Sequence, residues 1–166
     1  MKKTAITIFF AAGLFIFFTG AAQADSLMLT ASDFIPGQPG DSGVDCYIGW
    51  TLYNHVGATY RYFFAPVHLP QGAQVTSVVV YYEDDSTGYI EVDLTRRNMY
   101  SLTVQDMTDW ATTGDTPGLR NTKISPVLYW TINNEGYVYF VYIYYSDADA
   151  GSDLSIYGVK INYNAP

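Results

Sequence analysis

Most of the chain after residue 24 consists of short runs rich in Val, Ile, Tyr, Phe and Thr, separated by clusters of Gly, Pro, Asn and Asp. This pattern is typical of β-strands and turns, and a helical repeat of apolar positions is almost absent. The candidate strands are residues 27–31, 46–53, 59–65, 74–83, 89–97, 102–104, 119–124, 127–132, 137–145 and 154–163. The pattern therefore predicts eight to ten strands without crossover helices.

The first of two predicted β-hairpins joins residues 74–83 to residues 89–97 through a turn at 84–88. Its second strand alternates apolar and polar side chains. Such alternation is expected where one face of an antiparallel sheet covers a core and the other meets water.

The second predicted hairpin joins residues 127–132 to residues 137–145 through the turn at 133–136. Every position of 137–145 is apolar or aromatic. A central strand covered on both faces would have this composition, and so would a strand whose outer face presents tyrosines to a ligand.

These elements predict an all-β fold, a two-sheet antiparallel β-sandwich of jelly-roll or related Greek-key type. Residues 119–124 are expected at a sheet edge, because Arg120 and Lys123 suit an exposed edge. No repeat, low-complexity stretch or linker divides residues 25–166, which are predicted to form a single domain.

Residues 1–24 have the features of a cleavable signal peptide. Lys2 and Lys3 precede the apolar run 5–18, and residues 22–24 have the small-x-small pattern of a cleavage site. The alternative is a membrane anchor, but the run is shorter than the roughly 20 residues that span a bilayer. The protein is therefore expected to be exported to the periplasm or the extracellular space, with no membrane span after cleavage.

Charge and cysteine content narrow the function classes. Without Lys2 and Lys3, 6 basic residues face 16 acidic ones, so the formal charge moves from −8 to −10. This balance argues against nucleic acid and anionic membrane as partners, since both attract basic surfaces. The single Cys46 cannot form an internal disulfide; its apolar neighbours favour burial over pairing with another chain.

Several segments resemble a group of proteins. They are residues 64–77 (FAPVHLPQGAQVTS), 81–86 (YYEDDS), 94–96 (LTR) and 157–163 (YGVKINY). Over roughly residues 60–163 the chain resembles small exported bacterial β-sandwich proteins of unassigned function. The resemblance implies the same fold and brings no catalytic residues with it.

Catalytic patterns are weak, and the protein is predicted not to be an enzyme. A glycosidase needs two carboxylates about 5–10 Å apart, one with a raised pKa. Glu83 and Glu91 are expected on neighbouring strands of the first hairpin, but Glu91 lies on a polar face where charge is expected anyway. No Gly-x-Ser-x-Gly motif or phosphate-binding glycine loop is present.

Asp147, Asp149 and Asp153 are candidate calcium ligands, since they place three carboxylates in one loop and exported proteins meet calcium. The spacing is not that of an EF-hand, and a plain solvated loop is the alternative. Calcium is the one cofactor that the pattern suggests. The cysteine and the two histidines have no zinc-site spacing.

Aromatic side chains are the most abundant candidate chemistry. Tyr and Trp rings can present a flat face to a sugar, and five are candidates for a ligand platform: Trp50, Trp110, Trp130, Tyr142 and Tyr144. The alternative is that these rings form the core of a sandwich without disulfides. Trp110 is the favoured exception, because it lies in an irregular segment.

The sequence therefore favours an exported, non-catalytic β-sandwich module for binding or structure, with polysaccharide as the first ligand class. One alternative is an extracellular glycan hydrolase, which two acids sharing a pocket, with a shifted pKa, would favour. The other is a subunit of a surface assembly that meets another surface protein through residues 119–124 or exposed tyrosines.

Overall fold

The computed structural model describes residues 24–37, 46–48, 50–54, 62–114, 116–126, 130–147 and 150–166. The strands are β1 (Ala24–Thr30), β2 (Ile35–Pro36), β3 (Cys46–Ile48), β4 (Thr51–Tyr53), β5 (Tyr62–Val67), β6 (Gln74–Asp84), β7 (Ile90–Asn98), β8 (Val104–Asp106), β9 (Thr116–Ile124), β10 (Tyr137–Tyr145) and β11 (Leu154–Asn164). Short 3-10 turns follow β1 (η1, Ala31–Asp33) and precede β11 (η2, Gly151–Asp153). Residues 1–23 of the predicted signal peptide and the side chain of Cys46 lie outside this description.

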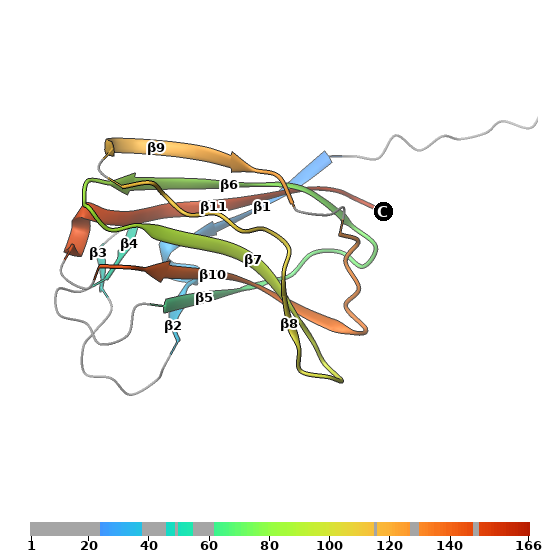
Figure 1. Ribbon diagram of the computed structural model, residues 1–166. Helices are drawn as coiled ribbons and strands as arrows, with labels where there is room; N and C mark the ends of the chain where they lie inside the picture. The colour runs from blue at the N-terminus through green and yellow to red at the C-terminus, as the bar shows by residue number, and fades with distance from the viewer. Residues whose placement is uncertain are drawn as a thin grey trace, which may run out of the picture.

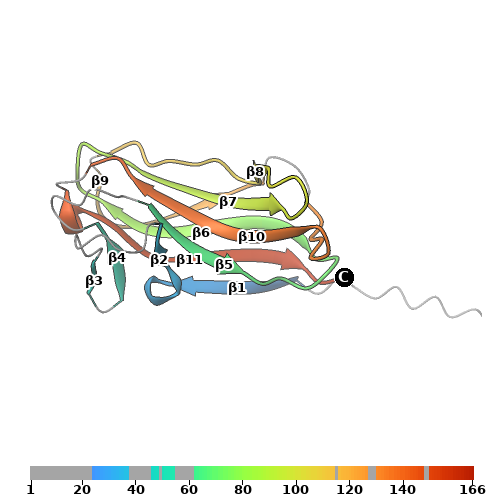
Figure 2. The same cartoon turned by 90° about the horizontal axis from the view of Figure 1, so that it is seen from below.

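The strands form two antiparallel sheets packed face to face, which confirms the predicted β-sandwich (Figure 1). The β11 sheet has the order β3-β4-β11-β6-β9, with β1 also paired to β11. The β10 sheet has the order β2-β5-β10-β7-β8 and lies in front in Figure 2. None of the described helices is long and apolar enough to span a membrane.

The pairing of most strands is that of a jelly roll. Apart from β2, β3 and β4, the strands pair as nested hairpins: β1 with β11, β5 with β10, β6 with β9, and β7 with β8. The chain thus passes repeatedly from one sheet to the other, as in the jelly-roll type that the strand pattern suggested. The predicted edge strand 119–124 is confirmed, since β9 ends the β11 sheet.

The first predicted hairpin is wrong. β6 pairs with β11 and β9, whereas β7 pairs with β10 and β8 in the opposite sheet. The turn after Asp84 therefore crosses between the sheets, and the Gly114 N–H fastens it by donating to Asp84 Oδ2 at 3.1 Å. The alternation of apolar and polar residues identified the buried face of β7. It did not identify the strands that pair with β7, because a strand in either sheet faces the same core. Glu83 and Glu91 consequently lie in different sheets.

The second predicted hairpin is also wrong in its pairing. Residues 127–129 lie outside the described part, and the following segment pairs with the start of β6: Ile132 N–H donates to Ala73 O at 2.8 Å. The turn itself is present, with Tyr137 N–H donating to Asn133 O at 3.0 Å, but it connects the two sheets.

A third difference concerns residues 46–53, predicted as one strand. They form the two short strands β3 and β4, paired from Cys46 with Tyr53 to Ile48 with Thr51. This split, together with the two-residue β2, explains why the described strands exceed the eight to ten expected.

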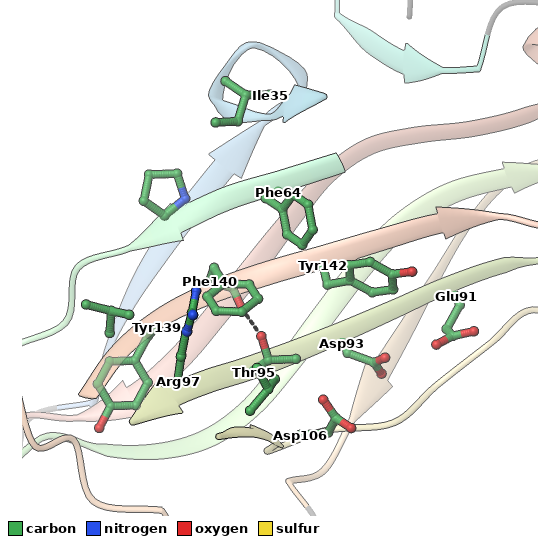
Figure 3. A pocket seen from close by; sticks show the side chains of 13 residues that line it. Ile35, Phe64, Glu91, Asp93, Thr95, Arg97, Asp106, Tyr139, Phe140 and Tyr142 are labelled. Atoms are coloured by element: carbon green, nitrogen blue, oxygen red, sulfur yellow. Dashed lines mark hydrogen bonds between the residues drawn. The ribbon is translucent and has the colours of Figure 1, made fainter. Parts of the chain in front are cut away.

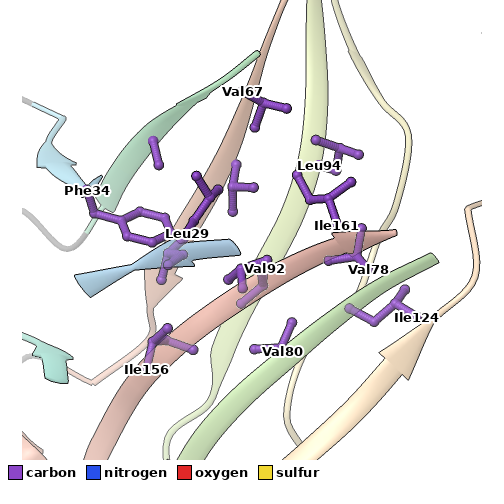
Figure 4. Packing of buried hydrophobic residues seen from close by; sticks show 14 of the residues in the cluster. Leu29, Phe34, Val67, Val78, Val80, Val92, Leu94, Ile124, Ile156 and Ile161 are labelled. Carbon is purple, nitrogen blue, oxygen red and sulfur yellow. The ribbon is translucent and has the colours of Figure 1, made fainter. Parts of the chain in front are cut away.

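The core lies between the sheets and consists of aliphatic and aromatic side chains from both (Figure 4). Ile90, Val92 and Leu94 of β7 are fully buried, as their alternation predicted. From the facing sheet, Ile156 and Ile161 of β11 are also fully buried. Since both sheets turn alternate residues inward, the remaining alternate residues of the β10 sheet form its outer face.

A candidate site on the outer face of the β10 sheet

A groove of about 800 Å³ lies across the outer face of the β10 sheet (Figure 3). Its lining residues come from all five strands of this sheet: Ile35, Phe64, Pro66, Glu91, Asp93, Thr95, Arg97, Val104, Asp106, Val138, Tyr139, Phe140 and Tyr142. The groove therefore belongs to the sheet itself and not to the loops at its ends.

Strand register places the lining side chains in rows across the sheet. In one row, Tyr142 of β10 is paired with Phe64 of β5 on one side and Asp93 of β7 on the other. In the next row, Phe140 is paired with Thr95, which is paired in turn with Asp106 of β8. Because paired residues point to the same face, each row runs from aromatic to acidic or hydroxylated side chains.

One half of the groove is lined by aromatic rings that belong to a continuous aromatic stripe. Within the groove these are Phe64, Phe140 and Tyr142, and beyond it the stripe continues with Tyr62, Tyr144 and Tyr89. Neighbouring ring centroids are 5.4 Å apart for Phe64 and Tyr142, 5.7 Å for Phe64 and Phe140, and 6.2 Å for Tyr62 and Tyr142. These separations are those of interacting aromatic pairs, so the rings support one another in a strip along β5 and β10.

The other half of the groove is an acidic row formed by Glu91, Asp93 and Asp106. Figure 3 shows these carboxylates on one side of the groove, opposite Phe64, Phe140 and Tyr142. Asp93 is only 6% exposed, whereas Glu91 is half-buried and Asp106 is exposed. The alternation along β7 had suggested that its polar face meets water. Instead, the structure buries Asp93 on this face.

Burial raises the pKa of Asp93 to about 7, and the negative charges of Glu91 and Asp106 add to the effect. A hydrogen bond with Glu91 raises this pKa further. The backbone N–H of Trp110, which donates to Asp93 Oδ1 at 3.4 Å, lowers it. Asp93 thus holds a proton close to neutral pH. Burial raises the pKa of Tyr142 to about 12, with smaller contributions from Glu91, Asp93 and the neighbouring tyrosines, so its hydroxyl stays neutral and can donate a hydrogen bond.

This arrangement can bind a flat, hydroxylated molecule. Ring faces offer apolar contact to the faces of sugar rings, and the carboxylates accept hydrogen bonds from hydroxyl or amino groups. Because the pKa of Asp93 is about 7, this residue can also exchange a proton with a bound molecule near neutral pH. Both properties occur within one groove.

The structure separates the five aromatic residues expected as a platform. Tyr142 lines the groove, and Tyr144 extends the aromatic stripe. Trp50 is 88% exposed in the turn between β3 and β4, away from the β10 sheet. Trp110 packs against the core and against Tyr82, with ring centroids 5.1 Å apart.

Trp130 also packs against the core, and the Arg96 guanidinium lies 3.8 Å from the centre of its ring. The same guanidinium lies 4.1 Å from the centre of the Tyr137 ring. Tryptophan content alone therefore did not point to the groove.

Sequence reasoning missed Phe64, Phe140, Asp93 and Asp106. One signal was available: Glu91 and Asp93 are two residues apart on a strand, which places both carboxylates on one face. Phe64 comes from β5, whose position beside β10 no local pattern reveals, and Phe140 lies on β10 itself.

Of the three calcium candidates, Asp149 lies outside the described residues, and Asp147 and Asp153 follow β10 and precede β11. Asp153 borders a separate polar hollow on the β11 sheet, where Tyr157 OH donates to Glu83 Oε2 at 2.8 Å. Within the described part of the chain, no three acidic, histidine or cysteine side chains gather as metal ligands. Calcium binding stays a prediction.

Comparison with protein-family models and with curated proteins gave no match to the chain. The resemblance to small exported bacterial β-sandwich proteins consequently stays a prediction. The functional conclusion rests on the groove.

Proposed function

We propose that the protein is a non-catalytic β-sandwich module that binds polysaccharide in the groove on the outer face of the β10 sheet. The observation that carries the proposal is the aromatic stripe lying beside the acidic row in one groove. With a predicted signal peptide, such a module would meet its ligand outside the cytoplasm.

The shape of the stripe suits an extended ligand. Phe140, Tyr142 and Tyr144 project from alternate positions of β10, and residues two apart on a strand are about 6.6 Å apart. Their partners on β5 widen the surface. A chain of sugar rings lying along β10 would cover several aromatic faces while its hydroxyl groups face the acidic row.

The test is a glycan array, followed by calorimetric titration of the best ligand with matched variants. Tyr142→Ala is expected to weaken binding about tenfold or more, because it removes the ring at the centre of the stripe. Tyr100→Ala is the control, since Tyr100 is 83% exposed and outside the groove lining. An array without ligands, or equal losses in the two variants, would contradict the proposal.

Glycan hydrolysis is a second candidate, favoured by Asp93 sharing the groove with two further acids and having a pKa of about 7. An acid of this pKa can protonate a leaving group near neutral pH. Binding without cleavage ranks first, because the aromatic stripe by itself accounts for sugar binding, whereas hydrolysis would also need a second carboxylate at a suitable distance from Asp93. Release of reducing ends from the bound glycan, abolished in Asp93→Asn, would reverse the ranking.

A further inference from the structure

We propose that the polysaccharide bound in the groove is cationic, with free amino groups that lie at the acidic row while its sugar rings lie on the aromatic stripe. This inference rests on the proposed function and names its ligand class.

In the described structure no cationic side chain acts on Asp93, the most buried member of the acidic row. No basic side chain is among the causes that shift the titration of Asp93, and the groups that do so are Glu91, Asp106 and one backbone N–H. Arg97 is the one basic residue among the described groove-lining residues. It lies beyond Thr95 at the opposite end of β7 from Glu91 (Figure 3).

Crowded carboxylates without a counter-charge favour a cationic ligand. An ammonium group placed among Glu91, Asp93 and Asp106 would replace mutual repulsion with attraction, strengthened by the low exposure of Asp93. A neutral glycan could donate hydroxyl hydrogen bonds to the same carboxylates but would leave the repulsion between them in place. A glycan with carboxylate groups would increase it.

The aromatic stripe acts in the same direction. The negative face of an aromatic ring attracts ammonium and guanidinium groups. This chain already uses that interaction where Arg96 lies over the rings of Trp130 and Tyr137. A ligand that combines sugar rings with ammonium groups therefore matches both halves of the groove.

The acidic row also determines how binding depends on pH. The groups that face Asp93 are Glu91 on its own strand, Asp106 on β8, Tyr142 on β10, and the backbone N–H of Trp110. Tyr142 is neutral throughout the physiological range. Asp93 takes up a proton below about pH 7, and a ligand cation prefers the ionised form. Affinity for a permanent cation is therefore expected to rise with pH.

The experiment compares three β-1,4-linked oligosaccharides of equal length by calorimetric titration: glucosamine, N-acetylglucosamine and N,N,N-trimethylglucosamine oligomers. At pH 6 the glucosamine oligomer is expected to bind at least tenfold more tightly than the acetylated one. Between pH 5.5 and 8.5, binding of the trimethylated oligomer is expected to strengthen by up to about 30-fold, because the ionised fraction of Asp93 rises by about this factor.

Matched variants assign the effect to the acidic row. Asp93→Asn is expected to remove the pH dependence for the trimethylated oligomer. Asp106→Asn, at an exposed position that tolerates the change, is expected to weaken binding of the glucosamine oligomer several-fold without affecting binding of the acetylated oligomer. Asp109→Asn removes a negative charge outside the groove lining and is expected to change the affinity for neither oligomer.

The outcomes separate this inference from the proposed function. Equal or tighter binding of the acetylated oligomer, reduced by Tyr142→Ala, would overturn the cationic ligand and leave polysaccharide binding in place. A glycan array without ligands, together with no binding of the three oligomers, would overturn both.

Discussion

Tyr145 illustrates how one side chain contributes to the core in two ways. Its ring is fully buried and meets Phe63 edge-on, with centroids 5.7 Å apart and planes at 88°. Its hydroxyl donates to Leu52 O at 2.7 Å, which links β10 to the short β4 across the sandwich. Burial raises the pKa of Tyr145 well above its ordinary value, so the hydroxyl keeps this proton.

Tyr145→Phe is expected to lower the free energy of unfolding by about 1–2 kcal/mol, because the Leu52 carbonyl loses its buried donor while the ring stays. Urea denaturation followed by tryptophan fluorescence measures the change. Tyr100→Phe removes a hydroxyl from an exposed ring and is the control. Equal midpoints for Tyr145→Phe and the wild type would show that the hydrogen bond contributes nothing net.

At the scale of elements, β11 holds the larger sheet together because β1 and β4 pair along one edge and β6 along the other. Its ladder with β6 shifts register between Ile156 and Gly158, which is a β-bulge. A Cβ atom on Gly158 would lie 2.9 Å from Leu29 O, a backbone atom of β1. Glycine at this position allows β1 to approach β11.

Gly158→Ala is therefore expected to displace β1 and to destabilise the fold by about 1–3 kcal/mol. Thermal melting measures the loss, and hydrogen exchange should show faster exchange in β1 than in β7. Gly136→Ala is the matched control, since its added Cβ would meet Asn133 Nδ2 at an ordinary 3.5 Å. Unchanged protection of β1 amides in Gly158→Ala would contradict this role of the glycine.

At the scale of the whole molecule, the groove imposes a stability cost that depends on pH. The pKa of Asp93 is about 7 in the folded protein and 3.8 in its unperturbed form, so the folded state binds this proton more tightly. The contribution of Asp93 to stability is therefore largest below about pH 4. It is lost progressively as pH rises through 7, at up to about 1.4 kcal/mol per pH unit.

Asp93→Asn should consequently match the wild type in melting temperature near pH 4 and become the more stable protein as pH rises to 8. The reason is that asparagine resembles the protonated acid and cannot ionise beside Glu91 and Asp106. Melting curves of both proteins from pH 4 to 8.5 measure the difference, with Asp109→Asn as the control. A constant difference across this range would mean that Asp93 is not titrating in the folded protein.

The jelly-roll pairing joins the first and last strands of the sandwich, from Ala24 with Asn164 to Thr30 with Gly158. Such pairings close long loops, and the entropy cost of that closure makes their formation slow. They also explain why adjacent strands such as β6 and β7, joined by a short turn, lie in opposite sheets. A short turn between two strands predicts that they pair with each other. In this sandwich β6 pairs instead with β11, and β7 with β10.

The sequence by itself determined that the protein is a β-sandwich, which residues of β7 face the core, and that residues 119–124 form an edge. Those features follow from alternation and turn residues, which act over a few positions of the chain. Only the tertiary structure decided which strands pair, and hence that Phe64, Tyr142 and Asp93 share one row. The reason is physical: alternation selects a face for each side chain, but the neighbour across that face is chosen by pairing between segments distant in the chain.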